Sequence, residues 1–298
     1  VDTSGLDLGL STVGGTLSAT AVLGGITDAG VLTITGASAF TTNADGVAIL
    51  FNENHAFTGA VTITTNDTSG SDSDATISAG SLKQLILAAS TIDGDLIVTS
   101  SFVPVDSDSS GTISETESNG ITDSGALTVG GTSSFQTSGT NANIVLDTTT
   151  NAFTGKVTLN TTGSSGDATL DNGTLDIVLG DGTSGSGATL ATSVGGNLTL
   201  ISGAAAGITD ASGETVTVGR NLSATTDRNS GVIDMETLAV GGSVALTTDG
   251  TGNAKIDNGS LNLDIAASSV GGDLRLTTAQ ADGITDGGTV TVGGNLTV

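Results

Sequence analysis

The most regular feature of the chain is a series of short runs in which apolar residues alternate with Thr, Ser or Asn. Such runs include "VLTIT" from Val31, "AVTIT" from Ala60, "DLIVT" from Asp95 and "SVALT" from Ser243. A period of two predicts half-buried strands, and the Gly pairs, Asn-Gly and Asp-Gly steps between the runs predict turns. No segment shows a convincing helical period. We favour a strand for "SLKQLILAAS" at 81–90, because its aligned copies carry Asn-Gly and β-branched residues.

The alternating runs belong to a long internal repeat. The motif "GITD" begins at Gly25, Gly120, Gly207 and Gly283, at intervals of 95, 87 and 76 residues, and a strand follows each copy. Other segments recur in step with it, such as "AFTG" at Ala56 and Ala152. Within the third unit, "VG" steps recur every 22 to 30 residues. Self-similarity of this kind is the signature of a solenoid, in which each repeat contacts only its neighbours.

We therefore predict an all-β fold, a parallel β-helix (β-solenoid) with coils of roughly 20–25 residues. One coil cannot bury its own apolar face, whereas stacked coils enclose a continuous column of Val, Ile and Leu. The chain is predicted to be one continuous solenoid over 1–298, expected to be a piece of a longer array because neither end shows an atypical capping segment. Its predicted divisions are a partial unit 1–35, unit 1 at 36–130 with an insertion at 101–119, unit 2 at 131–218, unit 3 at 219–292, and the start of another unit at 293–298.

The composition narrows the choice of partners. The chain has 31 acidic and six basic residues, a net charge of −25, 46 Gly, six Phe and no Cys, Trp or Tyr. This charge repels nucleic acid and anionic membranes and attracts divalent cations. No apolar run approaches the length of a membrane span. We expect neither a nucleic-acid partner nor membrane insertion, and the lack of Cys excludes a disulfide scaffold.

With its repeats "VGGNLTL" and "GITDSGALTVGG", the whole chain resembles the long β-strand-repeat proteins of bacterial surfaces, including filamentous-haemagglutinin-like parallel β-helices. The resemblance implies a secreted or cell-surface protein that serves as a fibre, a surface-layer component or an adhesin stalk. The expected partners are copies of the chain itself, stacked head to tail, and for an adhesin a cell-surface polysaccharide or another surface protein.

A possible metal site stands in the twelve residues "DSDSSGTISETE", Asp106 to Glu117. An EF-hand calcium loop has oxygen ligands at positions 1, 3, 5, 7 and 9, Gly at 6, an apolar residue at 8 and an acid at 12. Gly111 and Ile113 occupy positions 6 and 8, and Ile113 is expected to turn inward. The predicted Ca²⁺ ligands are Asp106, Asp108, Ser110, Thr112, Ser114 through water, and Glu117. The flanking residues do not read as helices, so the loop resembles the dockerin-type calcium loops of extracellular bacterial proteins.

The spacing of the repeats indicates that this loop is an insertion. The Gly before the apolar run and the Gly of "GITD" are 11 residues apart at Gly196 and Gly207, but 26 apart at Gly94 and Gly120. Fifteen extra residues therefore leave the solenoid in unit 1. A lone loop is expected to bind calcium weakly, with a Kd on the order of 10⁻⁴ to 10⁻³ M. The alternative is a solvated acidic loop without an ion.

Other acidic turns are weaker candidates. Asp67, Asp72 and Asp74 could surround an ion but lack fixed spacing. The Asp of each "GITD" is predicted to bond backbone N–H groups as a turn former; these residues are Asp28, Asp123, Asp210 and Asp286.

We expect no catalytic activity. The one His, His55, has no His in the other repeats and is interpreted as an exposed turn residue. A polysaccharide-degrading β-helix enzyme could use carboxylate pairs such as Asp171 and Asp176, but Asp positions that follow the repeat behave as turns do. Another alternative is a flat ice-binding face made by outward Thr pairs, as at Thr33, Thr62, Thr215 and Thr289.

Overall fold

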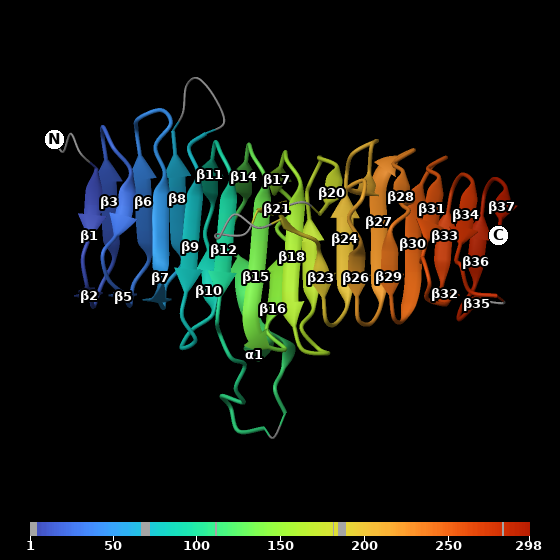
Figure 1. Ribbon diagram of the computed structural model, residues 1–298, viewed down its shortest axis with the longest axis horizontal. Coiled ribbons are helices and arrows are strands. Elements are labelled where there is room, and N and C mark those ends of the chain that lie inside the picture. The colour runs from blue at the N-terminus through green and yellow to red at the C-terminus, as the bar shows by residue number, and fades with distance from the viewer. Residues whose placement is uncertain (1–4, 67–71, 111, 181, 184–188, 282) are drawn as a thin grey trace.

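The chain winds into an elongated stack of coils. The computed structural model describes residues 5–66, 72–110, 112–180, 182–183, 189–281 and 283–298. It forms a β-solenoid of about 12 turns with about 23 residues in each, and the two termini lie at opposite ends of the stack (Figure 1). The predicted parallel β-solenoid is confirmed. No helix among these residues has the length and apolar character that crossing a bilayer requires.

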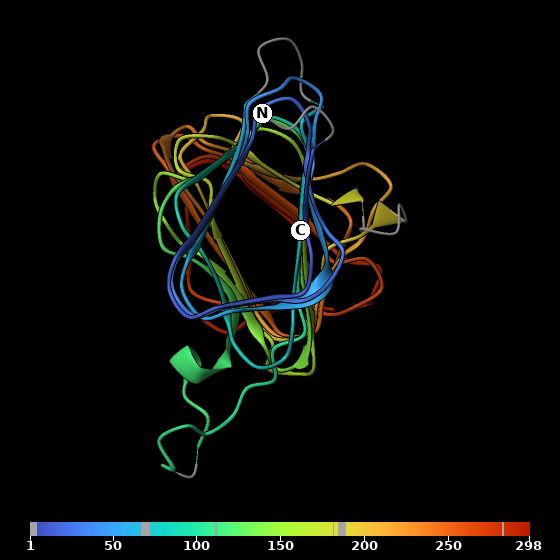
Figure 2. The same cartoon turned by 90° about the vertical axis from the view of Figure 1, so that its left-hand side faces the viewer.

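Nearly all the strands stack in two parallel rows, which together enclose the interior of the coils (Figure 2). Row 1 contains β1 (Leu6–Leu8), β2 (Ser11–Val13), β4 (Ile26–Asp28), β5 (Leu32–Ile34), β7 (Ile49–Phe57), β9 (Ala75–Ala79), β12 (Leu96–Ser100), β15 (Ser133–Thr140), β18 (Val157–Thr162), β20 (Ile177–Leu179), β23 (Ser193–Val194), β25 (Ile208–Asp210), β26 (Val216–Val218), β28 (Ile233–Met235), β29 (Leu238–Val240), β31 (Ala254–Asp257), β34 (Leu274–Thr277) and β37 (Leu296–Thr297).

Row 2 contains β3 (Leu17–Ala21), β6 (Ser38–Thr42), β8 (Val61–Thr65), β10 (Leu85–Leu87), β11 (Ser90–Ile92), β13 (Asn119–Asp123), β14 (Leu127–Val129), β16 (Asn143–Leu146), β17 (Ala152–Phe153), β19 (Ala168–Asp171), β24 (Leu198–Ser202), β27 (Leu222–Asn229), β30 (Ser243–Asp249), β32 (Leu263–Ile265), β33 (Ser268–Val270), β35 (Ile284–Asp286) and β36 (Val290–Val292). The segment 81–90, for which we favoured a strand over a helix, supplies β10 and the first residue of β11.

In most coils one side is a single long strand and the other side is a pair of short strands. The two sides exchange these roles along the stack. In row 2 the long β8 is followed by the pair β10 and β11, while in row 1 the pair β4 and β5 leads through β7 to the long β9. Between the "GITD" strands β4 and β13 the chain passes β7, β9 and β12 in row 1 and then crosses to row 2. Each repeat unit therefore spans three and a half coils, and successive "GITD" strands lie in alternate rows.

Where a long strand is followed in the next coil by a pair of short strands, a side-chain hydroxyl oxygen accepts a hydrogen bond from a backbone N–H of the long strand. The N–H of Ile63 in β8 donates to Ser90 Oγ at 3.0 Å, and that of Leu246 in β30 donates to Ser268 Oγ at 3.0 Å. Thr192 Oγ1 accepts from the N–H of Leu159 in β18 at 3.3 Å. Because a buried N–H without an acceptor is costly, the corner between two short strands needs a side-chain oxygen.

The core is a single column of apolar side chains enclosed by both rows. Alternate strand positions point inward, as the period of two predicts, and Val, Ile and Leu dominate. In units 1 and 2 the column also holds aromatic pairs: Phe40 with Phe51 at a ring separation of 4.5 Å, and Phe135 with Phe153 at 5.7 Å. Edge-to-face packing of this kind stabilises beyond simple burial.

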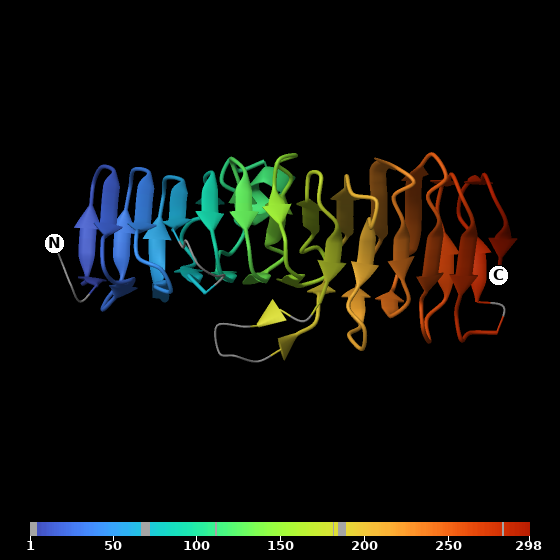
Figure 3. The same ribbon diagram turned by 90° about the horizontal axis from the view of Figure 1, so that it is seen from above.

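In the described part of the chain, an excursion between β12 and β13 and another that includes β21 (Gly182–Thr183) and β22 (Thr189–Leu190) leave the stack. At the first, the register offset from Leu96 to Ser133 is 37 residues, against 24 from Leu198 to Leu222. It contains the predicted insertion and projects away from the coils (Figures 1 and 2). The second includes the antiparallel pair β21 and β22, visible beside the stack in Figure 3, which the sequence did not lead us to expect.

Candidate functional site

The insertion brings the predicted acidic ligands together. One carboxylate oxygen from each of Asp106, Asp108 and Glu117 lies within 4.8 Å of the other two. Calcium–oxygen distances of about 2.3–2.6 Å place two ligands of one ion up to about 5 Å apart. The spacing of the three carboxylate oxygens lies within that limit. Among the described residues, this is the one group of three or more His, Asp or Glu side chains with such a spacing.

The remaining predicted ligands are tied to these carboxylates by hydrogen bonds. The backbone N–H of Ser110 donates to Asp106 Oδ1 at 3.0 Å and to Asp108 Oδ1 at 2.9 Å. Ser110 Oγ donates to the carbonyl oxygen of Thr112 at 2.9 Å, which brings the oxygens of positions 5 and 7 together. The loop is folded around its acids, while Gly111 at position 6 lies outside the described residues.

Glu117, at position 12, is the most heavily bonded carboxylate of the loop. Its Oε1 accepts from the backbone N–H and the hydroxyl of Ser107, both at 2.6 Å, and its Oε2 accepts from the same two groups of Ser114 at 2.9 Å. These donors lower the pKa of Glu117 to about 2, and hydrogen bonds from Ser110 also lower the pKa of Asp108. Both side chains are therefore anionic, as calcium ligands must be.

Two expectations about the loop are wrong. The residues 115–118 form a one-turn helix, α1 (Glu115–Ser118), where no helix was predicted. Ser114 caps it, and Ser114 and Glu117 form a capping box, in which each side chain bonds the other residue's backbone N–H. Ile113, expected to turn inward, is 49% exposed because the loop stands clear of the core. Val103 and Val105 at the base of the loop are exposed as well.

In the second acidic candidate, formed by Asp67, Asp72 and Asp74, one carboxylate is already bonded to a backbone N–H. Asp74 Oδ1 accepts from the N–H of Asp95 in the next coil at 2.8 Å, and burial raises the pKa of the Asp74 carboxyl. Asp72 is exposed, and Asp67 lies outside the described residues. Asp74 therefore has a structural role at the start of β9.

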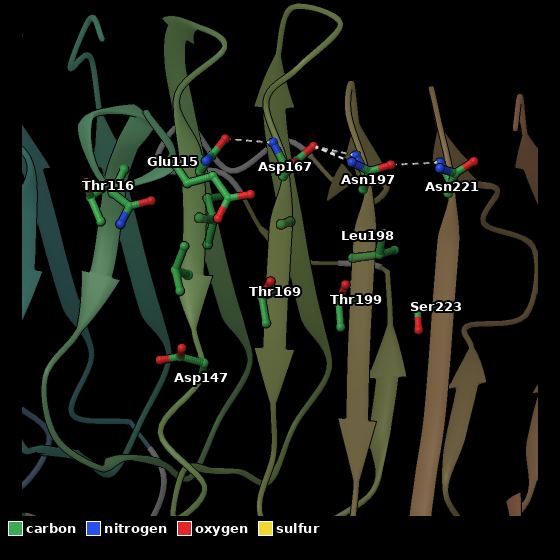
Figure 4. Close-up of a pocket in the computed structure, with 15 residues that line it drawn as sticks. Glu115, Thr116, Asp147, Asp167, Thr169, Asn197, Leu198, Thr199, Asn221 and Ser223 are labelled. Carbon is green, nitrogen blue, oxygen red and sulfur yellow. Dashed lines mark hydrogen bonds between the residues drawn. The ribbon is translucent and has the colours of Figure 1, made fainter. Parts of the chain in front are cut away.

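A polar trough lies on the outer face of row 2, beside α1, with a volume of about 630 Å³. It crosses β16, β19, β24 and β27, and Figure 4 shows its outward Thr169, Thr199 and Ser223 side by side on neighbouring strands. Glu115 and Thr116 of α1 stand at one end. The described residues that line the trough include three carboxylates, on Glu115, Asp147 and Asp167, and no Lys or Arg.

One edge of the trough is a ladder of Asn and Asp side chains (Figure 4). Asn143 Oδ1 accepts from the N–H of Asp167 at 2.9 Å, Asp167 Oδ1 from that of Asn197 at 2.6 Å, and Asn197 Oδ1 from that of Asn221 at 3.3 Å. Each side chain thus bonds the backbone of the next coil at the point where its strand begins. The ladder explains why Asn or Asp follows the Gly pair in "GGNL" and "GGDL".

The Asp of "GITD" bonds backbone N–H groups as predicted, but those of the following coil. Asp28 accepts from Asn52 and Glu53 at 3.1 and 3.0 Å, and Asp210 from Glu236 and Thr237 at 3.2 and 2.6 Å. A further set links Asp123 to Asp147, Thr148 and Asn151. The Asp286 copy, in β35, is exposed.

The interpretation of His55 as an exposed turn residue is wrong. His55 is 1% exposed and its Nδ1 accepts from the backbone N–H of Leu32 at 2.9 Å. In unit 2 the residue before "AFTG" is Asn151. A hydrogen-bonding side chain at the same position in two units is a signal in the sequence that this position serves the repeat.

The Asp residues and Thr residues that suggested other functions are dispersed. Asp171 bonds the N–H of Gly173, and the side chain of Asp176 is exposed. Thr33 belongs to row 1 and Thr62 to row 2; Thr215 and Thr289 precede β26 and β36, which are again in different rows. These four Thr residues do not share one face.

The stacked coils and the recurring contacts define the chain as a β-solenoid repeat protein. Residues 1–64, 102–160 and 251–298 match a family described as "Repeats of unknown function (DUF5649)". Because these segments make up more than half of the chain, the protein belongs to that family. No curated protein and no solved structure matches the chain significantly.

Proposed function

We propose that the chain is a non-catalytic structural segment of an extracellular fibre, surface layer or adhesin stalk, stabilised by calcium at Asp106–Glu117. The observation that carries this proposal is the continuity of the core, which runs through all the coils as one column. Such a column resists bending, since every coil is held to the next by ladder hydrogen bonds and by Asp, Asn and Ser side chains. A stiff spacer is the function that this construction serves best.

The roles of the chemically active residues support a non-catalytic function. The one His of the chain bonds a backbone N–H in the core, and the Asp residues of "GITD" bond the backbone of the next coil. These side chains are committed to holding coils together. The proposal places the protein on a bacterial surface on the strength of the resemblance of its repeats to surface proteins.

Self-association end to end is part of the proposal. Contact between stacked coils uses the same backbone groups whether the coils belong to one chain or to two, so strand edges of two copies can pair. Negative-stain microscopy with calcium and with a chelator tests this directly. Filaments longer than one solenoid are expected with calcium. Single rods under both conditions would exclude self-assembly and leave only the spacer role.

Calcium binding at the loop is tested by calorimetric titration of the wild type, Asp106→Ala and the matched control Asp227→Ala. Asp227 is an exposed acid of β27, far along the chain from the loop. The wild type and the control should show one site with a Kd on the order of 10⁻⁴ to 10⁻³ M, and Asp106→Ala should lack it. Three identical isotherms would show that calcium binds only diffusely to the acidic surface.

The trough beside α1 favours a second candidate function, adhesion to a neutral surface polysaccharide. Its amide, hydroxyl and carboxylate groups can bond sugar hydroxyls, and its three carboxylates disfavour an anionic chain. Cellohexaose is a suitable probe, with Thr199→Arg filling the trough and Thr33→Arg as the control on row 1. Binding that is lost only in Thr199→Arg would support this function, and no binding to the wild type would dismiss it for this sugar.

A further inference from the structure

His55 is a titratable residue that is buried in the apolar core. Its ring lies between two aromatic rings of the core, with centroids 5.5 Å from Phe51 and 5.6 Å from Phe57. Because Nδ1 accepts the Leu32 N–H, the neutral ring carries its proton on Nε2. Nε2 lies 3.2 Å from Asp28 Oδ2. We call this set of contacts the His55 bridge.

In the other repeat units the corresponding contacts involve no imidazole ring. In unit 2, Asn151 Oδ1 accepts from the N–H of Leu127 at 2.8 Å, and its Nδ2 donates to Asp123 Oδ2 at 2.6 Å. These are the same two connections that His55 makes. In unit 3, Thr237 bonds Asp210 of the preceding "GITD" through its backbone N–H and its hydroxyl. Asn and Thr do not gain a proton in mild acid, so among these three places only the one in unit 1 carries an imidazole beside the Asp carboxylate.

The coil above His55 lacks a side-chain bond that its equivalents in units 2 and 3 make. Units 2 and 3 place a fully buried Asn172 or Asn258 there, and each bonds the backbone of the coil below. Unit 1 has Ala79, which pairs in register with His55. A cavity of about 220 Å³ lies beside it, lined by His55, Gly80 and Ser101 among others. Unit 1 therefore lacks, in the coil above His55, the hydrogen-bonded amide that the other two units have there.

Two backbone hydrogen bonds lie between His55 and the base of the Asp106–Glu117 loop. Gly80 N donates to the carbonyl oxygen of His55 at 2.7 Å, and Ser101 N donates to that of Ala79 at 3.0 Å. Ser101 follows β12 directly and is the first residue of the excursion that carries the loop. Ala79 and Gly80 therefore stand between His55 and the base of the loop.

We propose that the His55 bridge is an acid-sensitive device that loosens unit 1 beneath the loop when His55 gains a proton. Protonation at Nδ1 removes the acceptor of the Leu32 N–H and sets two N–H groups against each other in a buried site. The charged groups that face the ring are Asp28 of β4 and Glu53 of β7. The described residues of β5 and β9, which pack on either side, contribute apolar or hydroxyl side chains.

The direction of the pH effect follows from burial. Burial lowers the pKa of His55 below 6.5, although Asp28 and Glu53 act in the opposite sense. The unfolded chain consequently takes up the proton first as the pH falls. The stability that the bridge supplies is fully present above pH 6.5 and is lost as the pH falls from 6.5 towards the lower pKa of the folded state.

The test uses the wild-type chain and His55→Asn, which copies unit 2. Because the chain has one His, a single imidazole C2–H resonance reports its titration by NMR without any variant. We expect a midpoint below pH 6.5 and, below it, faster exchange of the Leu32 amide after correction for the intrinsic rate. The thermal midpoint of the wild type should fall between pH 7 and pH 5 relative to that of His55→Asn.

Two outcomes would overturn the proposal. A His55 midpoint at or above pH 6.5 would show that Asp28 stabilises the charged ring more than burial opposes it. Equal pH dependence of Leu32 exchange in both proteins would show that the carboxylates alone govern acid loosening. The NMR measurement stands even if His55→Asn folds poorly, and neither result depends on whether the loop binds calcium.

Discussion

Asn172 provides the sharpest test of how the coils are held together. Its side chain is fully buried, its Oδ1 accepts from Phe153 N at 2.7 Å, and its Nδ2 donates to the carbonyl oxygens of Phe153 at 3.0 Å and of Asp176 at 2.5 Å. The change Asn172→Ala leaves the N–H and C=O of Phe153 buried without these partners. At about 1–3 kcal/mol for each of these two unpaired buried groups, the expected loss of stability is about 2–6 kcal/mol.

A matched control comes from the exposed ladder. Asn221 Oδ1 accepts from the N–H of Ser243 at 2.9 Å, but water can replace it there. Asn221→Ala should therefore cost only about 0.5–1.5 kcal/mol. Asn258→Ala is an internal replicate of Asn172→Ala, because Asn258 makes the same three bonds to Val240 and Asn262.

The assay must resolve local effects, because a solenoid need not unfold in one step. Hydrogen exchange followed by mass spectrometry, together with urea unfolding followed by circular dichroism, meets this need. Protection should fall in peptides that cover β17 and β19 for Asn172→Ala, and in those that cover β29 and β31 for Asn258→Ala. If Asn172→Ala costs no more than Asn221→Ala, water satisfies the buried groups and the reasoning fails.

Three further results are expected. Gly195→Ala should destabilise the stack strongly, because a Cβ there would lie 1.9 Å from a backbone oxygen of the preceding coil. Gly14→Ala is the control, since a Cβ at Gly14 meets open space. Equal thermal midpoints of the two variants would refute the predicted clash. Ser268→Ala should cost about 1–3 kcal/mol in urea unfolding by leaving a buried N–H of β30 without its acceptor, and a cost like that of the exposed Ser269→Ala would contradict it. Because the pKa of Glu117 is lowered from 4.5 to about 2, α1 should keep its cap until the pH falls through this range, and carboxyl NMR that shows a midpoint near 4.5 would exclude the bonds from Ser107.

The alternation of apolar and polar residues was enough to predict the fold. Side-chain direction along a strand has a period of two by covalent geometry alone, so "VTI" at Val61 indicates which side chains enter the core. The repeats then required stacking. The insertion was likewise visible as 15 extra residues between Gly94 and Gly120, and its acids were predicted to converge because EF-hand spacing brings them to one point.

Other features depended on which groups meet across coils. His55 was misinterpreted because an isolated His reveals neither its burial nor the Leu32 N–H that it serves. Ile113 was expected to face inward by analogy with a loop whose helices pack on it, but here the loop projects away from the coils and has no such cover. The short helix α1 forms because Ser114 and Glu117 cap each other. This signal is local, and a one-turn helix shows no helical period in the sequence.

The sequence by itself determined the solenoid, its inward side chains and the acidic insertion, because each of these follows from local spacing and from repetition. Only the tertiary structure decided that a unit spans three and a half coils, so that the Asp28 and Asp123 copies of one motif lie in opposite rows. The physical reason is that the number of residues in a coil varies with its turns, and the stacking partner of a strand is chosen by backbone hydrogen bonding through space. The same reason applies to Ser90, His55 and Asn172, whose roles are set by the backbone groups of another coil.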